Sequence, residues 1–179
     1  MKHLFWLDME MTGLEPQQHK VLEVAVIVTD WNFQSLKRFS TAVFQPDEEL
    51  KKMDDWCVKT HGASGLLKRV PEGLKENELD LALVDIVKEF YPSDEKVVLC
   101  GNSIGQDRKF VDRYLPQFAA RLHYRMLDVS SFKVVFENAF QQKFKKQNKH
   151  EALEDIEESI AELKHYLSFL DMSKLGRTP

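Results

Sequence analysis

The chain has 179 residues, 43% of them hydrophobic and 30% charged, which favours one compact domain over residues 1–179 with a full-sized core. Its formal charge of −4 argues against a protein that holds long nucleic acid through many phosphate contacts, but it allows a short anionic ligand. No apolar run approaches the roughly 20 residues that span a bilayer, so we expect no membrane association and a cytoplasmic location. Cys57 and Cys100 form no CxxC motif and are expected to be buried thiols.

Three segments near the N-terminus are rich in Val, Ile and aromatic residues and predict β-strands over residues 4–10, 21–29 and 35–45. A turn-forming stretch, Thr12 to Pro16, separates the first two. Because the connections are short, the three strands are expected to form an antiparallel meander.

The remaining chain alternates helical patterns with one further apolar strand. Helices are predicted over 48–61, 77–90, 105–114, 131–140 and 151–170, and a strand over 96–102. This order predicts an α/β domain with a mixed sheet and flanking helices. The last helix carries an apolar seam that favours packing on the sheet over a coiled coil, since it spans too few heptads: Leu153, Ile156, Ile160, Leu163, Leu167 and Leu170.

Two carboxylates, Asp8 and Glu10, interrupt the apolar first strand in "LFWLDMEMTGLEP". Side chains alternate across a strand, so both point to the same face. Neighbouring carboxylates repel each other and resist burial unless a cation is near. This pattern indicates either a metal site or an edge strand with a solvated, salt-bridged face.

A third acid, Asp107 in "GNSIGQDRKF", lies early in a predicted helix directly after a predicted strand. Strand ends and helix starts commonly build the sites of α/β sheets. The alternative is a solvated helix acid that pairs with Arg108 or Lys109.

A histidine and a fourth acid occur in "KHEALEDIEESIAEL", where His150 precedes Asp155 by five residues. Five residues turn an ideal helix by about 140°, so the two side chains would not share a helix face. We therefore expect the helix to begin near Glu151, with His150 in the preceding loop and directed towards the same site. Taken alone, a histidine there would more often be a surface residue.

Together the four carboxylates offer only oxygen ligands, which suit Mg²⁺ or Mn²⁺ and not structural zinc. Two such ions about 4 Å apart can stabilise the attacking and leaving oxygens of a phosphoryl transfer. A histidine titrates near neutrality and can deprotonate the attacking water.

The segments "DMEMTGLEP", "GNSIGQDRKF" and "HEALEDIEESIAEL" resemble the three motifs of the DEDD-type 3′-to-5′ exonucleases, in the branch with a catalytic histidine. "WCVKTHGASGL" and "HYRMLDVSS" resemble segments of the oligoribonuclease family within it. The resemblance implies a ribonuclease H-like fold and the hydrolysis of short oligoribonucleotides from the 3′ end to 5′-mononucleotides, with dinucleotides as characteristic last substrates. It also implies that Asp8, Glu10, Asp107 and Asp155 hold two divalent ions, and that His150 is the general base.

The same resemblance implies a pocket for two bases. Leu14 and Trp56 match the apolar pair that sandwiches the bases, and His61 matches another site residue. Stacking on an aromatic ring tolerates any base and is worth about 1 to 3 kcal/mol. The alternatives are helix packing for Trp56 and a helix-ending histidine for His61.

Contacts to the substrate's 5′ phosphate are implied for Ser103, Arg125 and Ser130. The guanidinium fork suits a phosphate, and Ser130 precedes a predicted helix whose free N–H groups would favour an anion. A plain N-cap is the alternative for Ser130. Tyr124 matches the tyrosine that one subunit of the family homodimer inserts into its partner's site.

Two rival functions stay open at this stage. A DNA exonuclease of the same superfamily would degrade longer chains, and a catalytically silent binding module would have no chemical need for all five acidic and histidine residues. The basic stretch over residues 143–149 could attract an anionic substrate or be a solvated charge run.

Overall fold

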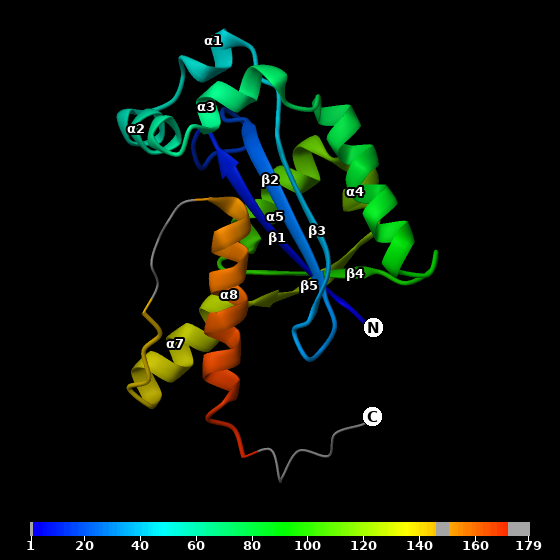
Figure 1. Ribbon diagram of the computed structural model, residues 1–179, viewed down its shortest axis with the longest axis vertical. Helices are drawn as coiled ribbons and strands as arrows, with labels where there is room; N and C mark the ends of the chain where they lie inside the picture. Colours follow the sequence, from blue (N-terminus) through cyan, green and yellow to red (C-terminus); the bar gives the residue numbers. More distant parts are fainter. Residues whose placement is uncertain (1, 146–150, 172–179) are drawn as a thin grey trace.

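The computed structural model describes residues 2–145 and 151–171 and contains a five-stranded mixed sheet with helices on both faces (Figure 1). The strands are β1 Leu4–Met11, β2 Val21–Thr29, β3 Ser35–Ala42, β4 Val97–Gly101 and β5 Leu122–Asp128. Their order is β3-β2-β1-β4-β5, with β1, β2 and β3 antiparallel and β4 parallel to both β1 and β5. The meander and the mixed sheet predicted from the sequence are confirmed.

Strand β5 was not predicted, because its sequence lacks a clean alternation. It is the outer strand of the sheet, and Tyr124, Arg125 and Met126 in its middle are exposed. Its pairing with β4 is also irregular: Val97 lies opposite Leu122, but Leu99 lies opposite Met126. Residues 123–125 therefore bulge out of the ladder, which hides the period of two that marks a strand.

Four of the five predicted helices are present, three of them with shifted boundaries, and several short helical segments have no predicted counterpart. The helices are α1 Asp47–Leu50, α2 Asp55–Ala63, α3 Leu66–Arg69, α4 Glu76–Phe90, α5 Gly105–Tyr114, α6 Pro116–Ala119, α7 Val129–Ala139 and α8 Ala152–Leu167, with a 3₁₀ turn, η1, at Val70–Glu72. The single helix predicted over 48–61 is wrong: α1 and α2 are separate. Asp54 interrupts the pattern by capping α2, where its carboxylate accepts a hydrogen bond from the Cys57 amide at 2.7 Å.

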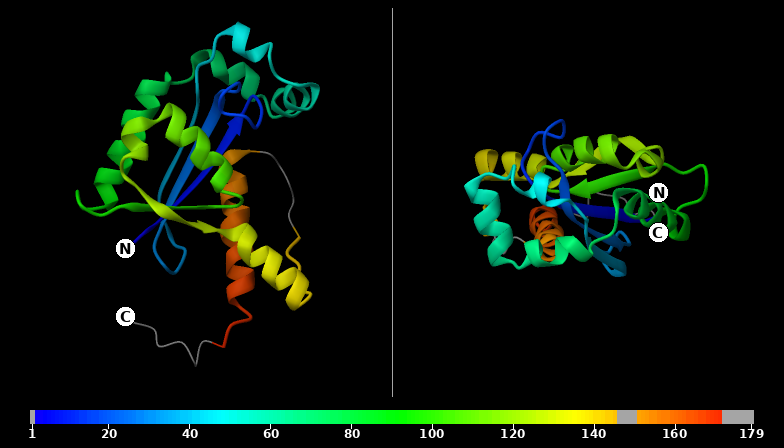
Figure 2. Two further views of the ribbon diagram at one scale, coloured as in Figure 1. Left: turned by 180° about the vertical axis from the view of Figure 1, so that it is seen from behind. Right: turned by 90° about the horizontal axis from the view of Figure 1, so that it is seen from above.

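The alternation of side chains along β1 divides the core into two layers. Phe5, Leu7 and Met9 pack with residues of α4, α5 and α6, whereas Leu4 and Trp6 pack with α7 and α8. Figures 1 and 2 show α8 on one side of the sheet and α4 to α6 on the other. By the same alternation, the side chains of Asp8 and Glu10 lie on the α8 side.

Helix α8 uses its apolar seam against the sheet, as predicted. Ile156 and Leu163 are buried beside Leu4, Trp6 and Ile27. Cys57 and Cys100 are buried free thiols, which confirms that expectation. Within residues 2–145 and 151–171, no helix has both the length and the apolar character needed to cross a membrane.

Candidate active site

The site lies where the two central parallel strands separate. β1 pairs with β4 only at Phe5–Leu99 and Trp6–Cys100. After Trp6, β1 no longer pairs with β4. Asp8 and Glu10 lie in this part of β1. Crevices at the carboxyl ends of parallel strands, next to a change in strand order, are the usual binding sites of α/β sheets.

Three carboxylates converge on the α8 face of this opening. One oxygen each from Asp8, Glu10 and Asp155 can be chosen so that all three lie within 4.8 Å of one another. β1 supplies the first two, and Asp155 comes from the first turn of α8. α8 begins at Ala152 with Glu151 at its N-cap, so the predicted start of this helix is confirmed. His150 itself lies outside the described residues.

Asp107 approaches the same strand from the α5 side. Its Oδ1 accepts a hydrogen bond from the Met9 amide at 3.0 Å, between the two acids of β1. The alternative pairing with Arg108 or Lys109 is wrong: Arg108 binds Asp112 at 2.7 Å, and Lys109 donates to Gln106 at 3.1 Å. The Asp107 carboxylate therefore accepts a hydrogen bond from the β1 backbone beyond the point where β4 pairs with β1.

The electrostatics of the cluster follow from burial and from the crowding of like charges. Burial raises the pKa of Glu10 to about 8, and the carboxylates of Asp155, Glu23 and Asp107 add to the shift. Burial likewise raises the pKa of Asp107 to about 7, although its hydrogen bonds from backbone amides oppose the change. The described residues around these carboxyl groups thus supply too little positive charge to stabilise the ionised forms.

This donor set fits hard divalent cations. All three clustered ligands are carboxylate oxygens, the type that Mg²⁺ and Mn²⁺ prefer. A divalent charge beside Glu10 and Asp107 would also favour their ionised forms and so would lower the pKa values that burial raises.

A cavity of about 570 Å³ opens above the acids. Asp8, Glu10 and Asp107 contribute to its lining, together with Leu14 and Trp56. Leu14 is 69% exposed and Trp56 is 59% exposed, so neither side chain is part of the core. The helix-packing alternative for Trp56 is therefore wrong, and two large apolar side chains are exposed in the cavity wall.

His61 also lines this cavity, although it is only 1% exposed. Its Nε2 lies 3.0 Å from the carbonyl oxygen of Met11, a contact in which the ring nitrogen must donate. Its Nδ1 lies 3.9 Å from Glu10 Oε2. The imidazole is thus held by the end of β1 and faces a metal-ligand candidate, which an ordinary helix-ending histidine would not do.

The loop that carries Leu14 is fixed at several points. Its base is closed by hydrogen bonds of 2.9 Å between Thr12 and Lys20. The side-chain amide of Gln106 donates to the carbonyl oxygen of Leu14, and Gln106 directly precedes Asp107 on α5. The Tyr114 hydroxyl lies 2.8 Å from the carbonyl oxygens of both Pro16 and His19. Leu14 is therefore presented by a tethered loop.

Ser103 and Ser130 are in contact, with their hydroxyl oxygens 2.9 Å apart. Ser103 lines the cavity and has a left-handed backbone, with φ of 54°. Ser130 is not the N-cap of the following helix, and its N–H is not free: Asp128 caps α7 and accepts from the amides of Ser103 and Ser130 at 2.9 Å. The helix begins at Val129, before the predicted start at residue 131, because Asp128 is its cap.

The other two predicted substrate residues lie on β5. Tyr124 is 74% exposed, and the Arg125 guanidinium carbon lies 5.4 Å from the centre of its ring. Both side chains belong to the exposed bulge of the outer strand rather than to the lining of the cavity. Of the basic stretch over 143–149, residues 146–149 lie outside the described part of the chain.

Sequence reasoning missed three polar residues near the site: Glu23, Asn102 and Gln106. Glu23 lies opposite Glu10 in the β1–β2 pair and is 4% exposed, and Arg69 binds its carboxylate at 2.7 Å. A single acid within the apolar run "VLEVAVIVT" was a usable signal for Glu23. Asn102 and Gln106 stand within a quoted motif, but only their contacts distinguish them from ordinary loop and helix residues.

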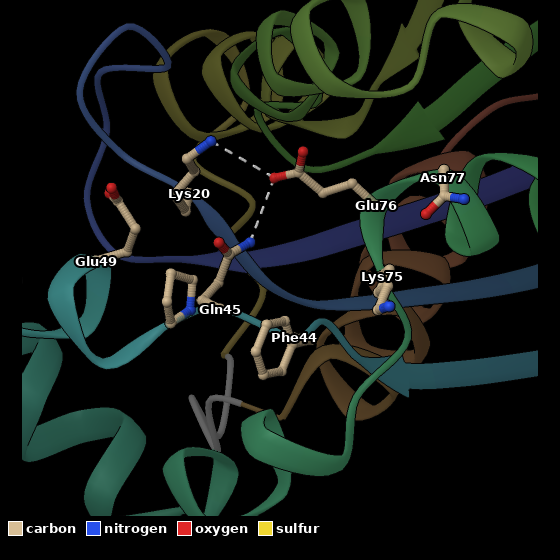
Figure 3. Close-up of a pocket in the computed structure, with 8 residues that line it drawn as sticks. Lys20, Phe44, Gln45, Glu49, Lys75, Glu76 and Asn77 are labelled. Carbon is tan, nitrogen blue, oxygen red and sulfur yellow. Dashed lines mark hydrogen bonds and ion pairs between the residues drawn. The ribbon is translucent and has the colours of Figure 1, made fainter.

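A second hollow of about 460 Å³ lies beside the N-terminus of α4 (Figure 3). Its polar groups contact one another: Gln45 Nε2 lies 3.4 Å and Lys20 Nζ 3.7 Å from Glu76. Gln45 also donates to the Val21 carbonyl oxygen at 3.0 Å. These contacts hold the segment after β3 against α4 and the end of the Leu14 loop.

Comparison of the sequence with known families matches residues 5–163 to the RNase T family of exonucleases. Oligoribonuclease of Klebsiella pneumoniae is 45% identical over 169 residues, which cover 92% of this chain and 93% of the relative. Oligoribonuclease of Escherichia coli K12 has the same identity and coverage, and that of Yersinia enterocolitica is 43% identical.

Solved structures with the same fold include Escherichia coli exonuclease I in complex with a 5cy-dT13 oligonucleotide, at a TM-score of 0.69 and 13% identity. The match covers 94% of this chain but only 41% of the exonuclease I chain. Exonuclease I of Methylocaldum szegediense gives the same TM-score at 15% identity, with 99% of this chain and 42% of that chain covered. The fold is thus ribonuclease H-like, and the chain belongs to the RNase T exonuclease family and, within it, to the oligoribonucleases.

Proposed function

We propose that this 3′-to-5′ exoribonuclease acts on very short RNAs in the cytoplasm, above all 5′-phosphorylated dinucleotides, and releases 5′-mononucleotides. The observation that carries the proposal is the convergence of Asp8, Glu10 and Asp155 beneath a cavity whose wall presents Leu14 and Trp56. Membership in the oligoribonuclease family supports short RNA as the substrate class.

The acids would hold the cofactor. Asp8, Glu10 and Asp155, with Asp107 beside them, would bind two divalent ions, Mg²⁺ or Mn²⁺. When bound, such ions supply the positive charge that stabilises the oxygens entering and leaving the phosphorus. The chain's own contribution is to fix these carboxylates on β1, α5 and α8, so that little reorganisation accompanies the reaction.

We assign the role of general base to His150. A histidine changes charge near neutral pH and can accept the proton of the attacking water. It directly precedes Glu151, the N-cap of the helix whose first turn bears Asp155. This assignment rests on that position in the chain and on the resemblance of the "HEALED" segment to the family motif.

Substrate recognition would depend on stacking of the two bases and on binding of the 5′ phosphate. The exposed side chains of Leu14 and Trp56 can hold two bases without reading their sequence. Ser103 and Ser130, with Arg125, would bind the 5′ phosphate and limit the pocket to two nucleotides. His61, held by the Met11 carbonyl oxygen, would line the cavity near Glu10.

We further propose that the active unit is a homodimer in which Tyr124 enters the partner's site. Support comes from the outer edge of β5, which pairs with no further strand among residues 2–145 and 151–171, and from exposed apolar residues on β5 and α7, including Met126, Val134 and Val135. Exposed apolar surface next to a free strand edge is typical of an interface.

One assay tests the substrate and the metal requirement. Purified protein is incubated with 5′-phosphorylated RNAs of two, three, five and ten nucleotides and with DNA of the same lengths, with and without a chelator. We expect the dinucleotide to be cleaved fastest, with activity abolished by chelation and by Asp8→Ala. Equal rates for long RNA or DNA would favour a general exonuclease. No hydrolysis at all would favour a silent binding module.

Complementation tests the dimer. Asp8→Ala inactivates a protomer's own site, whereas Tyr124→Ala removes only what that protomer gives its partner. Mixed dimers of the two variants should regain activity that neither variant has alone. If the mixture stays inactive although mixed dimers form, Tyr124 does not act across the interface.

A further inference from the structure

A buried acid on α8 stands apart from the metal ligands. Glu162 is 0% exposed, although a carboxylate is costly to bury without donors. Tyr166 donates its hydroxyl proton to Glu162 Oε1 at 3.0 Å, and the Asn102 side chain donates to Oε2 at 3.0 Å. The second contact reaches from α8 to the loop after β4, where Ser103 lies.

The carboxylate determines the orientation of the Asn102 amide. The Asn102 amide nitrogen donates to Glu162 Oε2, so the amide oxygen faces the other way. That oxygen, Oδ1, lies 2.6 Å from Ser130 Oγ. Since an amide oxygen also only accepts, Ser130 must give its single hydroxyl proton to Asn102.

Ser130 is then left as an acceptor on the side that faces Ser103. Its oxygen lies 2.7 Å from the Ser103 amide, which donates to it and to Asp128. These acceptors hold Ser103 in its left-handed conformation, which is unfavourable for residues other than glycine. The 2.9 Å contact between the two hydroxyls is then donated by Ser103, and within the serine pair it is this proton that can turn from Ser130 towards an anion in the cavity.

We propose that Glu162 is a positioning residue for the 5′-phosphate pocket. Glu162 orients the Asn102 amide, and the Asn102 oxygen accepts the hydroxyl proton of Ser130. Ser130 then accepts from the Ser103 amide, so that the Ser103 hydroxyl is the serine group that donates to the terminal phosphate. The inference rests on the proposed preference for 5′-phosphorylated dinucleotides and adds the residue on which that preference depends. Glu162 touches neither substrate nor metal in this role.

The test compares kcat/KM for the dinucleotides pApA and ApA, which differ only in the 5′ phosphate. In Glu162→Met the acceptor is lost, the Asn102 amide is free to rotate, and the preference for pApA should fall about tenfold, the scale of one hydrogen bond to a charged group. Hydrolysis of ApA should stay near that of the unmodified protein. Glu162→Gln has a side chain of the same size that keeps one acceptor oxygen, so this variant should retain the preference for pApA.

Two further variants separate positioning from stability. Tyr166→Phe removes the hydroxyl that donates to Glu162 Oε1 and should lower the melting temperature without changing the preference. Asn102→Ala removes the amide that connects Glu162 to Ser130 and should reproduce the loss of preference for pApA expected in Glu162→Met. The double variant should lose no more than either single change, because the two residues act in series. If Glu162→Met does not fold, Asn102→Ala and Glu162→Gln decide the question.

The outcomes are distinct. If the unmodified protein cleaves pApA and ApA equally well, the proposed phosphate cap is wrong, and the role of Glu162 is wrong with it. If the unmodified protein prefers pApA but Glu162→Met or Asn102→Ala lowers both substrates equally or leaves the ratio unchanged, the cap stands and the positioning role is overturned.

Discussion

Asp107 and Met9 are joined by a hydrogen bond of 3.0 Å from the Met9 amide to the Asp107 carboxylate. The contact ties α5 to β1 between the two acids of that strand, at the point where β4 no longer pairs with it. One side chain thus accepts a backbone hydrogen bond of the central strand and brings a fourth carboxyl group to the site.

Two substitutions at Asp107 should separate these roles. Asp107→Asn keeps an acceptor for the Met9 amide, so the fold should persist, while cation affinity should fall roughly 10- to 100-fold. Asp107→Ala leaves the buried amide without its acceptor and should also reduce the free energy of unfolding by about 1 to 3 kcal/mol. Calorimetric titration with Mn²⁺ and urea unfolding measure the two effects. Equal stability of the two variants would show that the hydrogen bond is unimportant for folding.

The stability of the metal-free protein should fall as the pH rises. Burial raises the pKa of Glu10 to about 8 and that of Asp107 to about 7, whereas both groups ionise near pH 4 in an unfolded chain, to within about half a unit. Between these limits the folded state binds more protons than the unfolded state, so the free energy of unfolding decreases with increasing pH. Chelator-treated protein should therefore melt at a lower temperature at about pH 8 than at about pH 5.

Two controls accompany this pH series. Glu10→Gln should flatten the dependence, because the substituted amide does not titrate. Saturating Mn²⁺ should raise the melting temperature most at high pH, where the ionised carboxylates bind a cation without first releasing protons. A melting temperature that rises steadily with pH in the metal-free protein would contradict the assigned shifts.

Base stacking can be tested at Trp56. Trp56→Ala should weaken dinucleotide binding by about 1 to 3 kcal/mol per stacked base, whatever the sequence of the dinucleotide. Because Trp56 is 59% exposed, the melting temperature should change little. Trp31→Ala is the matched control, since Trp31 is 50% exposed in the turn between β2 and β3, remote from the cavity lining. A similar loss of affinity in both variants would argue against a stacking role.

The tether of the Leu14 loop can be tested at Gln106. Gln106→Ala removes the hydrogen bond to the Leu14 carbonyl oxygen and should raise KM for dinucleotides several-fold, while kcat, which depends on the acids, changes less. Gln117→Ala, an exposed glutamine on the adjacent α6, should leave both constants unaltered. An unchanged KM in Gln106→Ala would show that the other anchors of the loop suffice.

Much of the site could be predicted because it depends on local geometry. The period of two along β1 placed Asp8 and Glu10 on one face, and the helical pattern after residue 150 placed Asp155 in a first turn, as the structure confirms. The failures involve contacts distant in sequence. Strand β5 exists through its pairing with β4, and its bulge and exposure remove the alternation that would have revealed it.

The sequence by itself determined the fold class, the candidate acids and the strand face that Asp8 and Glu10 share, because these follow from side-chain periodicity and from the chemistry of carboxylates. Only the tertiary structure decided how the acids meet, since the separation of β4 from β1 lets Asp107 reach the Met9 amide from the opposite layer. It also decided the roles available to Glu162 and Asn102, which are 60 residues apart in the chain. A hydrogen bond between such distant groups leaves no periodic signal, because it depends on how the layers pack.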